Sequence, residues 1–258
     1  MQLKDKVAVI TGGASGIGKA LAVRFLEEGA KGVVIADRQE QLVRQVGAEI
    51  GATALACDVT NENDILQLVA LAETQFGPID VFVSNAGIAE EGTEHADDEA
   101  WYRNWNIHVM AHIYAARAVA SQMAERGNGY LVNTSSAAGL LTHVNAATYA
   151  VTKHAAVAFA EYLAITYGPK GVKVSVLCPQ AVRTAMTQGR EGSVASVDGM
   201  IEPEELADSV ICAMDEETFL ILPHPVVLKY MQRKTGDYDR WLRGMQRLKH
   251  EYKNNAQI

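Results

Sequence analysis

The sequence predicts a single α/β domain with a doubly wound parallel β-sheet and helices on both faces. Short, continuous apolar runs alternate with longer segments of helical periodicity from residue 7 to about residue 222, which is typical of strands and helices in such a sheet. A glycine-rich turn follows the first apolar run, and polar residues follow the later runs. Because ligands bind at the carboxyl ends of parallel strands, these turns are the expected place for a functional site.

Composition supports this fold class and excludes several others. The 258 residues are 48% hydrophobic and can bury a substantial core. The net charge of −8 argues against a nucleic-acid partner. The first residues enter a strand pattern directly and no apolar run could span a membrane, so we expect a cytoplasmic protein without a membrane partner. The spacing of the three cysteines predicts buried thiols, not disulfides or a zinc site: Cys57, Cys178 and Cys212.

The first predicted strand, residues 7–10, leads into a glycine-rich turn and a helix that ends near residue 29. This arrangement is suited to a pyrophosphate, because glycines let the backbone approach it and the helix N-terminus offers unpaired N–H groups. A glycine cluster without this context could simply form a tight turn. The cofactor residues predicted here are Gly12, Ser15, Gly16, Ile17 and Gly18.

An acidic residue at the end of the second predicted strand favours NAD over NADP. Asp37 lies nineteen residues after Gly18, where a carboxylate can accept both hydroxyls of an adenosine ribose and repel a 2′-phosphate. The neighbouring Arg38 is a complication, because a guanidinium can accommodate that phosphate. The glycine turn itself carries no cation that could bind a 2′-phosphate, so NAD remains favoured over NADP.

Two more strand–helix units are predicted, with strands at 53–56 and 79–83 and helices at 39–50 and 63–76. Asp58 and Val59 follow the third strand. Asp58 is placed to receive an adenine amino group, or else it caps the next helix. The fourth strand leads into three further predicted cofactor residues: Asn85, Ala86 and Gly87.

The segment from Ser135 to Lys153 carries the chemistry. Tyr149 and Lys153 are four residues apart and share one face of a helix. A cation beside a phenol lowers its pKa, which makes Tyr149 a candidate general acid/base. Ser136 lies on the preceding loop and can hydrogen-bond a substrate oxygen. Taken alone, the pair also fits an exposed lysine beside a packed tyrosine.

Together the motifs resemble the short-chain dehydrogenases/reductases. They are TGGASGIG at 11–18, DV at 58–59, NAG at 85–87, Ser136, YAVTK at 149–153 and CPQAVRT at 178–184, in register from residue 5 to about 222. The resemblance implies a Rossmann-like domain, residues 1–222, that binds NAD and exchanges a hydride with a secondary alcohol or ketone. It also implies that an alanine-rich helix, predicted at 149–167, packs against its copy in a homodimer or homotetramer.

The same resemblance assigns roles to individual residues. It implies that Tyr149 transfers the proton, that Lys153 holds the ribose and lowers the pKa of Tyr149, and that Ser136 orients the substrate oxygen. The thirteen-residue interval to Tyr149 selects Ser136 over Ser135. Later strands are predicted at 172–177 and 219–222. Three residues after the first of these strands are implied to lie at the nicotinamide end of the cofactor: Pro179, Val182 and Thr184.

Among the positions that depart from the family pattern, two concern the site, and a third, Ser84, replaces an asparagine before the NAG motif. His108 stands where the family usually has an asparagine whose backbone carbonyl holds a water of a proton relay. That relay can survive, the imidazole can carry protons itself, or the histidine is simply packed in its helix. His108 and His112 have zinc-compatible spacing, but no third ligand is evident, so we expect no metal. Gln180 replaces a glycine and either lines the site or faces solvent.

The pocket residues suggest a medium-sized, partly apolar alcohol or ketone, and residues 185–200 fall where the family keeps a mobile substrate lid. The residues predicted to line the pocket are Ala89, Leu141, His143, Asn145, Gln180 and Met186.

Residues 223–258 are predicted to form a C-terminal amphipathic helical extension of the same domain. From residue 224 this tail has eight Lys/Arg against three Asp/Glu, and an apolar stripe recurs at helical intervals. A basic amphipathic helix can lie on a membrane, but it more often docks on protein. We expect a subunit contact, over a neighbour's pocket.

Two functions remain open from the sequence. The favoured one is an NAD(H)-dependent alcohol dehydrogenase or carbonyl reductase with a Ser-Tyr-Lys mechanism. The alternative is a catalytically weak or inactive NAD(H)-binding sensor or scaffold of the same fold. His108 is the feature that favours the sensor, and the complete set of Ser136, Tyr149 and Lys153 argues against it.

Overall fold

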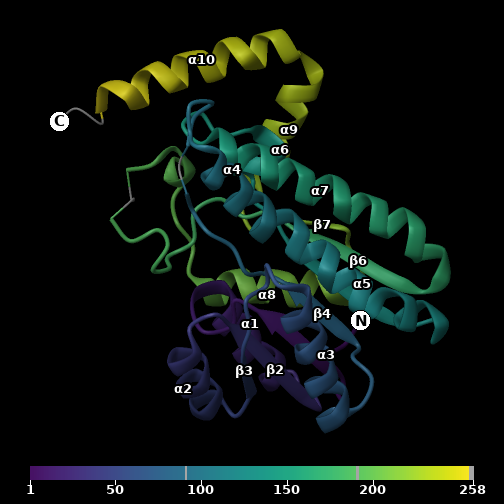
Figure 1. The fold of residues 1–258 in the computed structure, drawn as a ribbon. Coiled ribbons are helices and arrows are strands. Elements are labelled where there is room, and N and C mark those ends of the chain that lie inside the picture. Colours follow the sequence, from purple (N-terminus) through teal and green to yellow (C-terminus); the bar gives the residue numbers. More distant parts are fainter. Residues whose placement is uncertain (91, 190–191, 256–258) are drawn as a thin grey trace.

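The computed structural model describes residues 1–90, 92–189 and 192–255 and contains a seven-stranded parallel sheet between two layers of helices (Figure 1). The strand order is β3-β2-β1-β4-β5-β6-β7, so the chain winds outwards from β1 in both directions. This confirms the predicted fold class. The strands are β1 (Val7–Thr11), β2 (Gly32–Asp37), β3 (Thr53–Ala56), β4 (Val81–Ser84), β5 (Gly129–Thr134), β6 (Val172–Leu177) and β7 (Leu220–Ile221).

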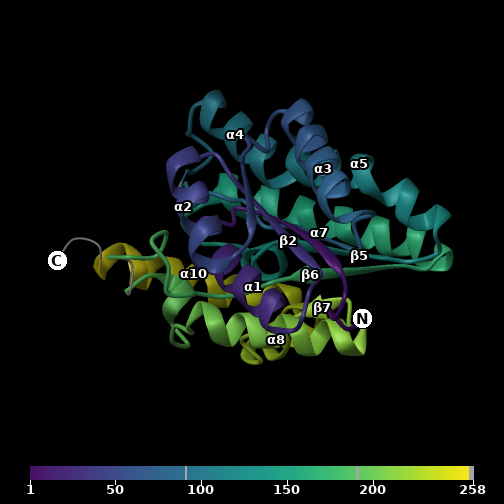
Figure 2. The same ribbon diagram turned by 90° about the horizontal axis from the view of Figure 1, so that it is seen from below.

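Helices cover both faces of the sheet because the strands bury alternate residues on each side (Figure 2). Along β1, Val7 and Val9 belong to one core, and Ala8 and Ile10 to the other. The helices are α1 (Gly16–Glu27), α2 (Glu40–Ile50), α3 (Glu62–Phe76), α4 (Asp98–Trp105), α5 (Ala111–Glu125), α6 (Ala138–Leu141), α7 (Ala147–Tyr167), α8 (Pro203–Glu216), α9 (Val226–Gly236) and α10 (Tyr238–Asn255).

Two local expectations are corrected. Asp58 does not cap α3: the cap is Asn61, whose side chain accepts a hydrogen bond from the Asn63 backbone N–H. The Asp58 carboxylate instead accepts hydrogen bonds from the backbone N–H and the hydroxyl of Thr60. Cys212 is exposed, whereas the other two cysteines are buried, because it lies on the side of α8 that faces away from the sheet.

The tail forms two helices that differ in how they attach to the body. Val227 at the start of α9 is fully buried against Ala137 and Leu141, which lie at α6. Helix α10 then continues from α9 along the top of the molecule as it is seen in Figure 1. Within the described ranges, none of the helices is both long and apolar enough to cross a membrane.

Candidate active site

A cleft of about 1340 Å³ opens at the carboxyl ends of the strands and continues under α9 and α10. It brings together nearly all of the residues predicted for cofactor and substrate. Those that line it are Gly12, Ser15, Gly16, Ile17, Asp37, Arg38, Asp58, Val59, Asn85, Ala86, Gly87, Ala89, Ser136, Leu141, His143, Tyr149, Lys153, Pro179, Gln180, Val182, Thr184 and Met186. Gly18, His108 and Asn145 are not part of its lining.

The glycine turn between β1 and α1 has a backbone that other residues could hardly adopt. Gly12 and Gly16 have φ values of +66° and +50°, in the left-handed region. A Cβ atom at Gly18 would lie 2.1 Å from the Gly12 carbonyl oxygen. The N-cap residue of α1, Ser15, makes no side-chain cap hydrogen bond, so its hydroxyl leaves the first amides of the helix to another acceptor. This turn fits a pyrophosphate.

Asp37 and Asn85 are fixed on either side of this turn. The Asp37 carboxylate accepts hydrogen bonds from the backbone N–H groups of Gln39, at 3.1 Å, and Ala14, at 3.4 Å. Asn85 donates from its side-chain amide to the Thr11 carbonyl at 3.1 Å, and its backbone N–H donates to the Thr11 hydroxyl at 2.9 Å. Asn85 therefore ties the end of β4 to the end of β1, which holds the cofactor edge of the sheet in place.

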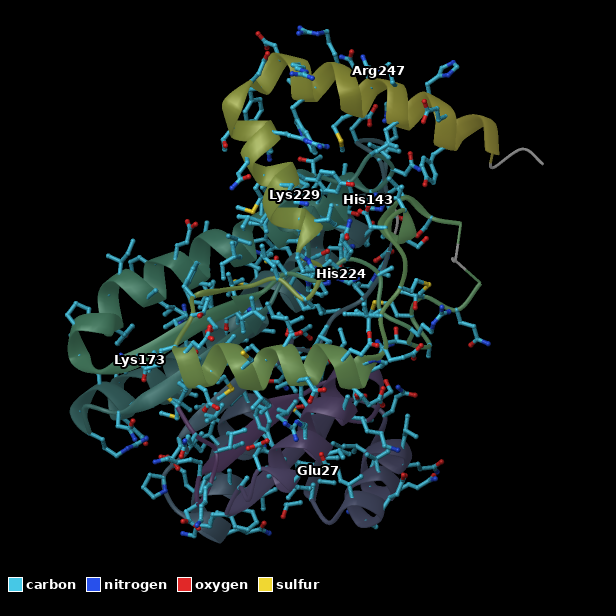
Figure 3. All side chains as sticks on the ribbon, turned by 180° about the vertical axis from the view of Figure 1, so that it is seen from behind. Glu27, His143, Lys173, His224, Lys229 and Arg247 are labelled. Atoms are coloured by element: carbon cyan, nitrogen blue, oxygen red, sulfur yellow. The ribbon has the colours of Figure 1, made fainter. Side chains whose placement is uncertain are left out.

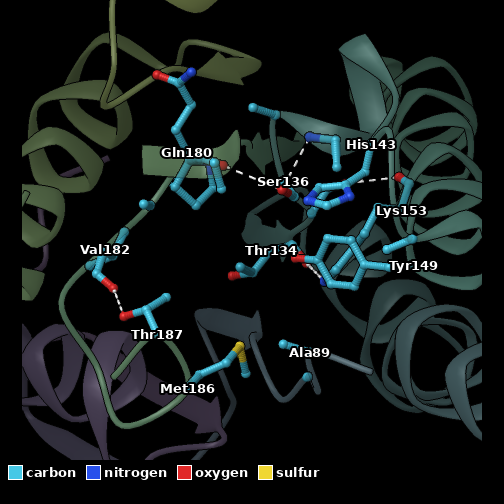
Figure 4. A pocket seen from close by; sticks show the side chains of 18 of the residues that line it. Ala89, Thr134, Ser136, His143, Tyr149, Lys153, Gln180, Val182, Met186 and Thr187 are labelled. Carbon is cyan, nitrogen blue, oxygen red and sulfur yellow. Dashed lines mark hydrogen bonds between the residues drawn. The ribbon is translucent and has the colours of Figure 1, made fainter. Parts of the chain in front are cut away.

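Ser136, Tyr149 and Lys153 converge where β5 meets α7 (Figure 4). Lys153 is 3% exposed, donates to the Thr134 carbonyl at 3.2 Å, and lies 5.5 Å from the centre of the Tyr149 ring. The Ser136 hydroxyl donates to the Pro179 carbonyl at 3.4 Å and accepts from the Ala138 backbone N–H at 3.1 Å. Since an ammonium has three donors, Lys153 retains two for another acceptor.

Ser135 is already engaged in the fold. Its hydroxyl donates to the Lys153 carbonyl at 2.8 Å, and a Cβ at Gly139 would lie 2.5 Å from that hydroxyl. It ties the loop after β5 to helix α7. This leaves Ser136 as the serine available to a substrate, in agreement with the sequence-based choice.

Burial shifts the pKa values of Tyr149 and Lys153 in a way that the sequence did not indicate. Desolvation raises the pKa of Tyr149 above its ordinary value, and a hydrogen bond with Ser136 acts in the opposite direction. Desolvation lowers the pKa of Lys153 to about 8. Lys153 is not among the causes of the Tyr149 shift, so the lowering of the Tyr149 pKa by this lysine stays a prediction.

His108 lies in a π-helical turn, Asn106–Met110, between α4 and α5, a feature that often marks functional sites. It is fully buried, and its ring meets the Tyr149 ring edge-on, with centroids 5.4 Å apart. Nδ1 lies 3.0 Å from the Thr152 hydroxyl, and Nε2 lies 3.2 Å from the Ile88 backbone nitrogen. The ring therefore bridges the loop after β4 and helix α7.

Each ring nitrogen of this imidazole has its partners within the fold. Nδ1 faces the Thr152 hydroxyl, which also lies within hydrogen-bond distance of the Thr148 and Tyr149 carbonyls. Nε2 lies 3.2 Å from the Ile88 backbone nitrogen and 3.1 Å from the Ile88 carbonyl oxygen, so the tautomer decides whether Nε2 accepts from the first or donates to the second. Burial, followed by the charge of Lys153, holds the pKa of His108 well below its usual value. The histidine is neutral, and both ring nitrogens are occupied.

His112 lies one turn further along and is 1% exposed. Neither of its ring nitrogens has a hydrogen-bond partner in the structure, and burial lowers its pKa to about 3. In the part of the chain that the structure describes, no three His, Cys, Asp or Glu side chains gather in a way that could hold a metal ion.

The predicted substrate residues are distributed unevenly around Ser136, Tyr149 and Lys153. His143 lies beside Ser136, and Met186 and Ala89 lie on another side of the cavity (Figure 4). Gln180 points its amide away from Tyr149 and donates to Asp198 at 2.9 Å. The predicted lid, residues 185–200, contains a short 3₁₀ turn, Val194–Ser196. Residues 190 and 191 of that lid lie outside the described residues.

The structure adds two features that sequence reasoning missed. Asp198 accepts hydrogen bonds from both Gln180 and the Tyr230 hydroxyl, at 2.9 Å each. We call these three residues the Asp198 clasp, and it joins the segment after β6, the lid and α9. The second feature is that α10 directs its apolar stripe towards this chain's own cleft. The periodicity predicted the stripe but carried no signal of its direction.

Comparison with known proteins identifies the family. The family model described as short chain dehydrogenase matches residues 6–194. The 1-deoxy-11-beta-hydroxypentalenate dehydrogenase of Streptomyces exfoliatus is 35% identical over 231 residues, which cover 86% of this chain and 84% of that protein. The 2-(S)-hydroxypropyl-CoM dehydrogenase 3 of Xanthobacter autotrophicus is 34% identical over 239 residues, or 85% of this chain and 93% of that protein.

A similar solved structure supports the same assignment. The short-chain dehydrogenase/reductase from Burkholderia phymatum, in complex with NAD, superposes with a TM-score of 0.85 at 26% identity. The match covers 93% of this chain and 96% of that one. The chain belongs to the short-chain dehydrogenase family of oxidoreductases.

Proposed function

We propose that the protein is an NAD(H)-dependent oxidoreductase that transfers a hydride between nicotinamide and a secondary alcohol or ketone. The observation that carries this proposal is the convergence of Ser136, Tyr149 and Lys153 in the same cleft as the glycine turn and Asp37. One part of the cleft fits a dinucleotide, and the adjoining part offers a proton donor beside a hydroxyl. The relatives' names, which denote dehydrogenases of hydroxylated compounds, agree with this chemistry.

The residues present fit NAD. The glycine turn leaves room for a pyrophosphate, and Asp37 is oriented by two backbone N–H groups so that its oxygens can accept ribose hydroxyls. Arg38 is exposed beside it. Lys153 has two donors left for the second ribose. When bound, the nicotinamide supplies the hydride acceptor or donor. The Burkholderia phymatum structure holds NAD.

Tyr149 holds the proton of the reaction at its phenol oxygen. Because its pKa is raised, the phenol is protonated near neutral pH and is ready to donate to the oxygen of a ketone that is being reduced. In alcohol oxidation the same oxygen must accept a proton, so that direction gains from higher pH. Lys153 carries its charge below about pH 8 and then favours the phenolate form. Ser136 hydrogen-bonds the substrate oxygen.

His108 acts as a positioning residue in this proposal. Both of its ring nitrogens are held by groups of the fold, Thr152 and Ile88, which supports a structural role for the ring. Its ring fixes the Ile88 backbone and the Thr152 side chain, and it supports one edge of Tyr149. The bridge keeps the loop after β4 at a constant distance from α7. We propose that His108 replaces the family's asparagine in architecture without taking part in proton transfer.

We also propose the assembly and location of the enzyme. Helix α7 exposes three large apolar side chains, Val151, Tyr162 and Ile165, and Ile165 is 76% exposed. These would be covered in a homodimer or homotetramer. Three free cysteines fit a reducing compartment such as the cytoplasm. The packing of α9 on α6 supports the assignment of the tail to the catalytic domain. The last three residues of the predicted extension, 256–258, lie outside the described residues.

The test is spectrophotometric. A panel of secondary alcohols would be incubated with NAD, and separately with NADP, at mildly alkaline pH, and the formation of reduced nicotinamide followed by absorbance. We expect turnover of some alcohols with NAD and much weaker turnover with NADP. A preference for NADP would show that Arg38 outweighs Asp37. NADH binding without turnover of any alcohol or ketone would favour the sensor.

A further inference from the structure

We propose that the outer end of the cleft, under α9 and α10, binds the anionic end of the substrate. The substrate is then an elongated alcohol or ketone with an apolar chain that ends in a carboxylate, sulfonate or phosphate. This inference rests on the proposed oxidoreductase function, because the same cleft holds Tyr149. It assigns the substrate class to that site.

The tail is attached directly to the catalytic loop. Ala137 follows Ser136 and forms a small core with Leu141 and Val227 of α9. Trp241 at the start of α10 packs against this core, with its ring centroid 6.4 Å from that of Tyr230. The position of α10 is thus fixed relative to Ser136, and a ligand under α10 lies next to the reacting groups.

Helix α10 offers the cleft an apolar stripe. Trp241, Met245 and Leu248 share one face and line the cleft together with Gly244. Figure 3 shows α10 above the region that holds His143, which lines the same cleft. Leu141 and Val197 line the cleft from other elements. An apolar chain of substrate lying between these surfaces would remove both surfaces from water, which favours binding.

Three arginines line the same end of the cleft. They are Arg233 on α9 and Arg240 and Arg247 on α10, two helical turns apart. A Cβ atom at Gly244 would lie 3.9 Å from the Arg247 guanidinium, so this group folds back towards the residue that faces the cleft. The Arg233 guanidinium lies 5.7 Å from the centre of the Tyr230 ring. All three arginines reach the cleft from one side.

The acids nearby are hydrogen-bonded to neutral groups and do not pair with these arginines. Asp237 lines the cleft, but its carboxylate accepts a hydrogen bond from the Arg240 backbone N–H at the start of α10. Both oxygens of Asp198 are engaged in the clasp. Among the described residues, none of the three arginines forms an ion pair. Their donors therefore remain available to a ligand.

The chemistry of the guanidinium selects the ligand. Its planar set of N–H donors pairs with carboxylate, sulfonate or phosphate oxygens through two parallel hydrogen bonds. The overall charge of the chain is −8, whereas the tail is basic. The arginines of the tail can therefore attract an anion to the outer end of the cleft, although the rest of the chain repels it. A substrate with its hydroxyl at Tyr149 and its anionic group at α10 would use both ends of the site.

The test compares two substrates of the same chain length, of which one carries a negative charge and the other does not. One is a straight-chain hydroxy acid with its hydroxyl on the penultimate carbon, and the other is its methyl ester. We expect kcat/KM for the acid to exceed that for the ester by roughly tenfold or more. The double variant R240Q/R247Q should lose this preference through KM while it retains ester turnover. The matched control is R243Q, since Arg243 lies on the same helix outside the cleft lining.

Sulfonate and phosphate analogues of the same chain length identify which anion the site prefers. A second measurement needs no turnover: calorimetric titration of the NADH-loaded protein with a straight-chain carboxylate and with the alcohol of equal length. Tighter binding of the carboxylate, lost in R240Q/R247Q, supports the anion site even if no alcohol is oxidised, which would then count against the proposed function alone.

Two results would overturn the inference. One is equal use and equal binding of acid and ester by the unmodified enzyme. The other is a loss in R240Q/R247Q that R243Q reproduces. Binding to vesicles of anionic phospholipid that depends on Arg240 and Arg247, without any acid-over-ester preference, would reassign these arginines to a membrane surface.

Discussion

The two ends of the cleft are built in opposite ways. At the cofactor end, the functional side chains come from strand ends and α7 and are held by partly or fully buried hydrogen bonds, as in Lys153 to Thr134 and Asn85 to Thr11. At the outer end, the side chains come from the lid and the tail, and they are largely exposed. The cofactor end holds its functional side chains in a narrowly defined geometry. Substitutions at the outer end can change which ligand binds without moving those side chains.

The difference is also one of energetics. Buried polar groups at the cofactor end, such as His108 and Lys153, lose hydration and have shifted pKa values. A substitution there leaves a partner unsatisfied and has a large effect. At the outer end, exposed arginines and the single Asp198 clasp interact with solvent as well, so each contributes less. This contrast sets the order of the expected effects.

The largest effect is expected from Tyr149→Phe. Removal of the phenol oxygen eliminates the proton donor, so kcat should fall on the order of a thousandfold, while NADH affinity stays the same. Tyr162→Phe, on the exposed face of the same helix, is the matched control and should leave kcat unchanged. Steady-state kinetics and NADH fluorescence titration measure both. A near-normal kcat in Tyr149→Phe would show that Tyr149 is not the proton donor.

Asp37→Ala should act on cofactor binding. Loss of a charged acceptor for the ribose hydroxyls weakens NADH binding by about ten- to a hundredfold, and removal of the negative charge beside Arg38 lets NADPH bind relatively better. Fluorescence titration with NADH and with NADPH gives the ratio of the two dissociation constants. Asp239→Ala, an exposed acid on α10, is the control. An unchanged NADH-to-NADPH ratio in Asp37→Ala would mean that discrimination lies elsewhere.

The buried histidines should make the fold sensitive to acid. The pKa of His112 is about 3 in the folded state and near 6.5 in the unfolded chain. The unfolded state binds the extra proton, so this contribution to stability is complete above pH 6.5 and is lost as the pH falls towards 3. Within this window, His112 should lower the free energy of unfolding by about 1.4 kcal/mol for each unit by which the pH falls.

Urea unfolding at several pH values checks this slope. His112→Leu should flatten the pH dependence whether or not it lowers absolute stability, because the slope counts protons and not packing. His95→Gln, at an exposed position, should leave the slope unchanged. An identical slope in the unmodified protein and His112→Leu would show that His112 is protonated in the folded state.

The smallest effect is expected at the outer end, in the Asp198 clasp. Tyr230→Phe removes one hydrogen bond between α9 and the lid and should raise the substrate KM about two- to fivefold, with kcat nearly unchanged. Tyr238→Phe, an exposed tyrosine of α10, is the matched control. Kinetics with saturating NAD measure the change. If kcat of Tyr230→Phe fell as far as that of Tyr149→Phe, the outer end would matter as much for the chemical step as the cofactor end, contrary to this comparison.

Much of the fold was accessible from the sequence. Strands covered on both faces read as continuous apolar runs, and β6 begins and ends at the predicted residues, Val172–Leu177. Boundaries were less certain at the sheet edge: the last strand was predicted at 219–222 and spans Leu220–Ile221. A short edge strand pairs on one side only and leaves a weak pattern. The π-helical turn at His108 gave no sequence signal, because it differs from an α-helix by a single hydrogen-bond register.

The sequence by itself determined the sheet, the glycine turn and the spacing of Ser136, Tyr149 and Lys153, because these depend on local patterns and on the placement of strand ends. The tertiary structure alone decided three other properties. They are the direction of the apolar stripe of α10, the Asp198 clasp and the raised pKa of Tyr149. Each depends on contacts or burial created by segments far apart in the chain, and no local pattern encodes which distant surfaces will meet.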